Sequence, residues 1–309
     1  MNGGEQMKLY SALFVLSLIW GMSFLFIKVL LGVFDPWQIV FIRCLLGIMT
    51  IVPLFMISRQ TVNWKTLPLK KLLFVGFLNA GLPWGLIAWS ETFLDSGYTA
   101  ILNATTPIWT SIMGVFFFSI TLRWKQWIGV IVGFVGILLL MDVDAPGLTK
   151  SQLGLGIVLM LIATCCYGYS SQYAKKHLQE TTVWITASST LFAGMLLSAM
   201  MMLFTDGWHL PEDSLNYYSL LSIVGLGVFG SGIAYLLYYY MISAGSAEFA
   251  TLVTYLVPVS AVIWGSVLLD EKIHLSAFWG LLLIFTGVYL TGKRGKKKKP
   301  LHLQHDRTA

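Results

Sequence analysis

The chain has 309 residues, of which 57% are hydrophobic and only 11% are charged. A soluble domain carries roughly 25% charged residues, so this chain has too few polar side chains to cover a water-soluble globule. The formal net charge of +6 does not indicate a nucleic-acid partner, because most positive residues lie in short loops and in the C-terminal tail. The composition predicts a protein embedded in a lipid bilayer.

Apolar runs of about 20 residues, the length at which a helix crosses a bilayer, recur from Leu9 to Leu290. We predict an all-α membrane protein with ten transmembrane helices, in chain order 9–31, 37–57, 69–91, 97–120, 125–141, 152–174, 182–204, 217–241, 247–269 and 275–292. The first run is too long for the core of a secretory signal, and no small-x-small cleavage site precedes Asp35-Pro36. Residues 293–309 form a basic tail that we expect to anchor the topology at an anionic membrane surface, with a regulatory or nucleic-acid-binding tail as the alternative.

The second five spans repeat the first five. Residues 151 positions apart match in the later spans of each half, as Gly76 matches Gly227 and Pro107 matches Pro258. Earlier spans match at a spacing of 147, and the change of spacing falls in a loop. We therefore predict one repeat at 9–141 and a second at 152–292, and such repeats are typical of transporters.

The loop charges predict the orientation of the repeats. With the N-terminus placed in the cytoplasm, most of the 20 lysine and arginine residues fall on the cytoplasmic side, whereas Lys150 and Lys272 fall outside. Each repeat has an odd number of spans, so the second must enter the bilayer from the opposite face. The prediction is two inverted five-helix repeats with both termini in the cytoplasm.

The sequence offers no enzyme chemistry. It has no HExxH motif, and its five histidines lie at helix ends, in loops or in the tail, where none is placed to activate Ser231. Cys44, Cys165 and Cys166 form neither a disulfide framework nor a zinc motif. We expect no catalytic residue, no metal site and no cofactor.

Four charged residues stand out within or beside the spans. Arg43 lies about seven residues into the second span, where it either faces an anion in a cavity or bonds a neighbouring helix. Lys28 is expected to extend toward the membrane surface. Glu91 and Glu248 flank two connections, and we expect interfacial positions, with uptake of a coupling proton by either as the alternative.

Aromatic and hydroxyl residues collect in the third, fourth, eighth and ninth spans, and Pro107 and Pro258 follow polar residues in mid-span. A proline there removes a backbone hydrogen bond that neighbours must replace. Paired prolines of this kind are typical of helices that line a cavity.

These residues together resemble a known family, the EamA-type transporters of the drug/metabolite transporter superfamily. The resemblance rests on Trp20-Gly21-x-Ser23-Phe24, Phe41-Ile42-Arg43-x-Leu45, Ala100-x-Leu102-x3-Thr106-Pro107, and Pro258, Asp270-Glu271 and Trp279-Gly280. It implies a ten-helix carrier in which spans 1, 3, 4, 6, 8 and 9 surround a central cavity. Family members move amino acids and other small metabolites, commonly outward.

We expect a secondary transporter of the bacterial inner membrane that exports a small metabolite by alternating access, as a monomer or homodimer. The alternatives are a lipid flippase on the same scaffold and a non-transporting chaperone or receptor subunit. The predicted substrate-binding residues are Trp20, Arg43, Trp84, Asn103, Thr106, Tyr235, Tyr239 and Tyr255.

Overall fold

The apolar segments form helices because a helix satisfies its own backbone hydrogen bonds where no water is available. The computed structural model describes residues 3–59, 67–94, 96–140, 150–205, 216–269 and 275–292. The basic tail and the Asp270-Glu271 pair lie outside these ranges. Within them, six helices are long and apolar enough to cross a membrane, and shorter apolar helices accompany them.

The helices of the first half group into five spans at the predicted places. The first, second and fifth spans are the single helices α1 (Gly3–Leu30), α2 (Pro36–Ile57) and α7 (Trp124–Leu140). The third span is made of α3 (Leu69–Gly76), η2 (Phe77–Gly81) and α4 (Leu82–Phe93). The fourth is made of α5 (Ser96–Asn103) and α6 (Thr106–Phe118). The first helix begins six residues before the predicted start, because the polar residues after Gly3 continue it beyond the apolar run. Asp35 caps α2 through a capping box with Gln38.

The second half follows the same order. The sixth, seventh and tenth spans are the single helices α8 (Lys150–His177), α9 (Val183–Met201) and α14 (Leu275–Gly292). The eighth span is made of α10 (Tyr217–Val224), η3 (Gly225–Ile233) and α11 (Ala234–Ala244). The ninth is made of α12 (Ala247–Thr251) and α13 (Val253–Leu269). Within the described ranges, the two halves thus supply ten helical spans to an all-helical membrane protein.

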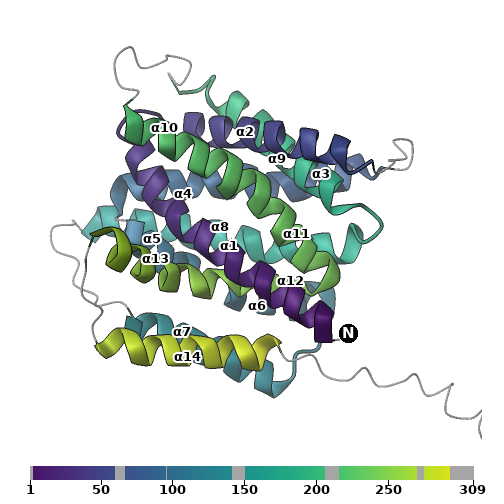
Figure 1. Ribbon diagram of the computed structural model, residues 1–309, viewed down its shortest axis with the longest axis vertical. Coiled ribbons are helices and arrows are strands. Elements are labelled where there is room, and N and C mark those ends of the chain that lie inside the picture. Colours follow the sequence, from purple (N-terminus) through teal and green to yellow (C-terminus); the bar gives the residue numbers. More distant parts are fainter. Residues whose placement is uncertain are drawn as a thin grey trace, which may run out of the picture.

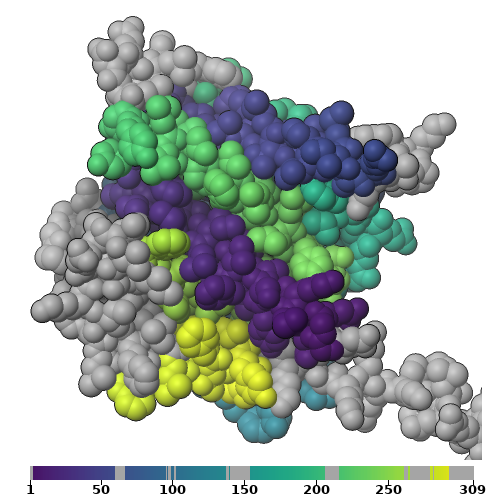
Figure 2. Space-filling model, in the orientation of Figure 1, coloured from purple at the N-terminus to yellow at the C-terminus, as the bar shows by residue number. Residues whose placement is uncertain are grey.

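The spans form layers that are visible in Figure 1. The helices α2 and α9 pack together on one side, and α7 and α14 pack together on the opposite side. Between them lie α1, α4, α8, α11 and α13. Figure 2 shows α1 crossing one face of the molecule, with α10 and α11 on one side of it and α14 on the other. Large apolar side chains such as Phe116 and Phe204 are exposed on the outside, as expected for a surface that meets lipid.

Two spans contain π-helical turns in matching places. The segment η2 (Phe77–Gly81) interrupts the third span, and η3 (Gly225–Ile233) interrupts the eighth. Moved by 151 positions, η2 falls inside η3. Segments of this kind are frequent at functional sites.

The two proline spans are broken differently. Pro107 lies in the first turn of α6, directly after the break between α5 and α6. Pro258 lies inside α13, and the break in that span comes earlier, at Leu252. Equivalent prolines in the sequence therefore have different places in their helices.

Glycines bring α7 and α14 into close contact. A Cβ atom added at Gly129 would lie 2.8 Å from the main-chain oxygen of Gly287, and one added at Gly136 would lie 2.8 Å from that of Gly280. Gly129 and Gly280, and likewise Gly136 and Gly287, are repeat partners. Small residues thus let the last spans of the two halves meet backbone to backbone.

Candidate substrate-binding cavity

A cavity of about 50 Å³ lies between the two halves, close to the middle of the molecule. Seven of the ten spans supply its walls, and the first half contributes most of them. The lining residues are Trp20, Ser23, Phe24, Ile27, Arg43, Asn79, Trp84, Ile87, Asn103, Thr106, Tyr167, Tyr238, Thr251 and Thr254. All of these side chains except Trp20 and Tyr167 are buried, so most of the walls lie inside the helical bundle.

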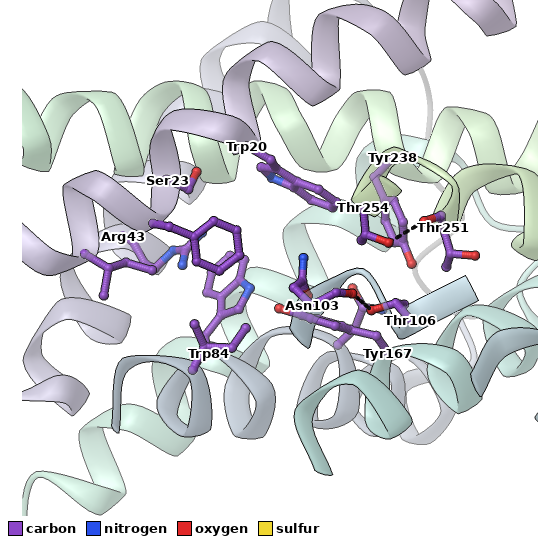
Figure 3. A pocket seen from close by; sticks show the side chains of 14 residues that line it. Trp20, Ser23, Arg43, Trp84, Asn103, Thr106, Tyr167, Tyr238, Thr251 and Thr254 are labelled. Carbon is purple, nitrogen blue, oxygen red and sulfur yellow. Dashed lines mark hydrogen bonds between the residues drawn. The ribbon is translucent and has the colours of Figure 1, made fainter. Parts of the chain in front are cut away.

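Arg43 and Trp84 form one end of the cavity (Figure 3). The guanidinium carbon of Arg43 lies 3.4 Å from the centroid of the Trp84 ring, which is close cation–π stacking. Its Nε atom donates a hydrogen bond of 3.1 Å to Ser231 Oγ in η3. In the described part of the chain no carboxylate pairs with this guanidinium, so its remaining N–H groups are available at the cavity wall.

Hydroxyl and amide groups line the rest of the space, with Tyr238, Thr251 and Thr254 toward the end away from Arg43 (Figure 3). Tyr238 shares a hydrogen bond of 2.6 Å with Ser171 Oγ. Asn103 Oδ1 is buried and has no hydrogen-bond partner among the described residues. The cavity therefore offers a cation, aromatic faces and one unused acceptor.

Several lining residues are repeat partners of one another. Trp20 in α1 matches Tyr167 in α8 at the spacing of 147. At the spacing of 151, Ile87 in α4 matches Tyr238 in α11, and Asn103 in α5 matches Thr254 in α13. Equivalent positions of the two halves thus face one space, but with different side chains.

The structure brings five of the eight predicted site residues to this cavity: Trp20, Arg43, Trp84, Asn103 and Thr106. The three predicted tyrosines lie elsewhere. The Tyr235 ring packs edge-on against Trp84 with centroids 5.1 Å apart, and its hydroxyl donates to the main-chain oxygen of Asn79. Tyr239 hydrogen-bonds Thr190 Oγ1 at 2.7 Å.

Tyr255 points toward the α7–α14 layer. Its hydroxyl donates to the main-chain oxygen of Val130 at 2.7 Å, and its ring lies against Gly133. The small glycine makes room for the ring. Tyr255 therefore joins α13 to α7 and does not line the cavity.

Several residues that line the cavity were not among the predicted site residues. Ser23, Phe24 and Ile27 follow Trp20 at helical spacing on α1, and a strict search for the face that contains Trp20 would have found them. Tyr167 could have been found as the repeat partner of Trp20. Thr251 gave no such signal, because it lies before the break in its span.

The two acidic residues that flank the connections are both buried in the protein. Glu91 is 0% exposed, and neither of its carboxylate oxygens has a hydrogen-bond partner among the described residues. Glu248 is also buried, but its Oε1 accepts a hydrogen bond of 2.6 Å from Gln172 Nε2. Lys28 is exposed, as expected of a side chain that extends toward the surface, and its Nζ donates to the main-chain oxygens of Glu91 and Leu94.

No group of three or more histidine, cysteine, aspartate or glutamate side chains that could hold a metal ion occurs in the ranges that the structure describes. All three cysteines are free. The polar groups of the cavity suit recognition of a small molecule.

Comparisons with known proteins agree with this geometry. The profile of the EamA-like transporter family matches residues 7–142 and again 154–293. The uncharacterized inner membrane transporter YedA of Escherichia coli K12 is 29% identical over 97% of this chain and 96% of its own length. The uncharacterized transporter YoaV of Bacillus subtilis is 23% identical over 89% of this chain and 93% of its own.

The fold is also found in a solved crystal structure, to which this chain is similar with a TM-score of 0.73 at 16% sequence identity. The similarity covers 92% of this chain and 96% of the chain in that crystal structure. The two profile matches cover nearly all of the chain, and the described helices have the lengths and apolar surfaces of a multi-pass membrane protein. The chain therefore belongs to the EamA-like transporter family and is a membrane transporter, not an enzyme.

Proposed function

We propose that this protein is a secondary transporter that moves a small carboxylate-bearing metabolite, such as an amino acid, outward across the cytoplasmic membrane by alternating access. The observation that carries the proposal is the state of Arg43. It is 5% exposed, stacked on Trp84, directed at the cavity, and without a carboxylate partner in the described residues. A buried cation of this kind is costly unless an anion meets it, and a substrate carboxylate supplies that anion.

Asn103 supports an amino acid as the second feature of the substrate. Its unpartnered Oδ1 would accept a hydrogen bond from an ammonium group, and the nearby aromatic faces of Trp20 and Tyr238 favour a cation. The cavity is small, with room for about three or four water molecules. A substrate of amino-acid size would therefore enter when the halves move apart.

We also propose that the two halves, 9–141 and 152–292, are inverted five-helix repeats and that both termini are cytoplasmic. The repeat partners that face one another across the cavity support this arrangement, because alternating access in such folds is a rocking of one repeat against the other. Labelling of cysteines introduced at Lys8 and at Thr149 in intact cells tests the orientation. Only the cysteine at position 149 should react with an impermeant reagent.

A thermal-shift screen of the purified protein against amino acids and other small carboxylates tests the substrate, because a ligand that binds the folded state raises its melting temperature. Compounds that shift the melting temperature are then followed as flux from loaded proteoliposomes. Flux of the compounds that bind supports the proposal. Binding of none, together with movement of labelled phospholipid between leaflets, would favour the lipid flippase.

A further inference from the structure

Glu91 lies one helical turn beyond the cavity wall. Trp84, Ile87 and Glu91 share one face of α4, and the first two line the cavity. On the neighbouring helix α1, Ile27 also lines the cavity, and Lys28 follows it directly. The bond from Lys28 Nζ to the main-chain oxygen of Glu91 holds the two helices together at this point. The carboxyl group is thus placed at the end of the binding space.

The carboxyl group has no structural role that its contacts can account for. Both oxygens are buried and have no hydrogen-bond partner in the described ranges, whereas the main chain of the same residue is bonded to Lys28. Glu248 offers the contrast, since Gln172 bonds its carboxylate and ties α12 to α8. Burying an ionised carboxylate without hydrogen bonds is costly, so this site favours a carboxyl group that has taken up a proton.

Two positive charges oppose that preference. Lys28 on α1 is bonded to the main chain of Glu91, and Arg43 on α2 stacks on Trp84, which precedes Glu91 by seven residues on the same face of α4. The phenol of Tyr167 on α8 is another titratable group nearby, and it lines the same cavity as Arg43. Of these two cations, Lys28 stays bonded to main-chain oxygens, while Arg43 faces the cavity, where an anion can neutralise it.

We propose that Glu91 is the proton-binding group of this transporter and that its proton is linked to the substrate through Arg43. When a substrate carboxylate binds Arg43, it cancels the positive charge that favours the ionised form of Glu91. The Glu91 carboxylate then takes up a proton from water and becomes a neutral carboxyl group. Release of the anion restores the charge and expels the proton. Binding of the anion at Arg43 and of the proton at Glu91 are therefore linked, and the inference rests on the proposed function only for the identity of that anion.

Infrared pH titration of the full-length protein in lipid nanodiscs tests the proton site without any substrate. The carbonyl stretch of a protonated carboxyl group should be present in the wild type and absent in Glu91→Gln. In Arg43→Gln, which removes the opposing charge, the same band should persist to higher pH. The matched control Glu180→Gln makes the same chemical change at an exposed turn residue and should leave the band unaltered.

A band that survives in Glu91→Gln, or one that titrates identically in Arg43→Gln, overturns the proposal. If Glu91→Gln does not fold, Glu91→Asp serves instead, and the band should then shift in frequency rather than vanish. A second measurement follows proton uptake with a pH indicator when glycine, or any compound that shifts the melting temperature, is added in weak buffer. Failure of every compound to bind counts against the proposed function alone, because the infrared result stands by itself.

Discussion

Lys28 and Lys175 each bond main-chain oxygens at the end of a matching helix, and one of the two acceptors is equivalent in the two halves. Lys28 Nζ donates to the main-chain oxygens of Glu91 and Leu94, at 2.8 and 3.1 Å. Lys175 Nζ donates to those of Ile242 and Ser243, at 2.8 Å each. The lysines are 147 positions apart, and Glu91 and Ile242 are 151 positions apart, which are the two spacings of the sequence repeat. Each lysine neutralises the negative end of the span that follows the π-helical turn.

Replacing Lys28 by methionine should lower stability. The change keeps the length of the side chain but leaves the last carbonyls of α4 without a donor, at a cost of about 2 kcal/mol for hydrogen bonds to a charged group. Thermal unfolding of the purified protein measures the effect. Lys8→Met at an exposed position of α1 should leave the melting temperature unchanged, and an equal loss in both variants would show that the contact at Glu91 is not the cause.

Arg43→Lys should weaken ligand binding although it keeps the charge. A lysine ammonium can neither stack as a plane on Trp84 nor reproduce the Nε bond to Ser231 together with a two-point contact to a carboxylate. We expect about a tenfold increase in Kd, or about 1.4 kcal/mol, from ligand titrations followed by thermal shift. Arg123→Lys, at an exposed position, is the control, and equal Kd values in all three proteins would remove Arg43 from the binding site.

The neighbouring tyrosines of α11 should respond differently to loss of their hydroxyl groups. Tyr238 lines the cavity and bonds Ser171, whereas Tyr239 bonds Thr190 outside it. Both Tyr238→Phe and Tyr239→Phe lose one buried hydrogen bond, so both should lose about 1 kcal/mol of stability. Only Tyr238→Phe should also change the Kd of a ligand. A larger change of Kd in Tyr239→Phe would mean that the binding space extends toward α9.

Gly287→Ala should disrupt the pairing of α7 with α14. The new Cβ would lie 2.5 Å from the main-chain nitrogen of Gly133 and 2.6 Å from the main-chain oxygen of Gly129, and backbone atoms there cannot move aside independently. We expect a loss of about 1–3 kcal/mol, as for other overpacked contacts. Gly154→Ala is the matched control, because its Cβ would meet nothing within 4 Å. A melting temperature that falls equally in both would contradict the close contact.

The sequence was sufficient to predict the spans, because apolar length is the main requirement for crossing a bilayer. Arg43 and Trp84, two of the residues proposed for the site, do line the cavity, and their role in binding stays a prediction. It did not predict which tyrosine of α11 faces the cavity. The nine π-helical residues of η3 change the angle between successive side chains. A prediction that assumes the α-helical period along the whole span therefore assigns the wrong residues of α11 to the cavity side, as it did for Tyr235 and Tyr238.

The sequence also did not predict that the carboxyl group of Glu91 is buried without hydrogen-bond partners in the described ranges. Its place near the end of the apolar run predicts its depth in the membrane but says nothing about burial by other helices. Its burial comes from the neighbouring helices, since Lys28 of α1 bonds the main chain of Glu91 and Gly156 of α8 accepts a hydrogen bond from Ser90 of α4. Only the packing of three separate segments reveals a carboxyl group without partners in the described ranges.

The matching positions of η2 and η3 also bear on the ancestry of the chain. A π-helical turn is an irregularity that a random change rarely places at the same point in two separate helices. Its presence in both the third and the eighth spans indicates that it already existed in a single five-helix ancestor, before the gene was duplicated. The side chains around it then diverged, to asparagine at position 79 in one copy and glycine at position 230 in the other, while the irregular backbone was inherited twice.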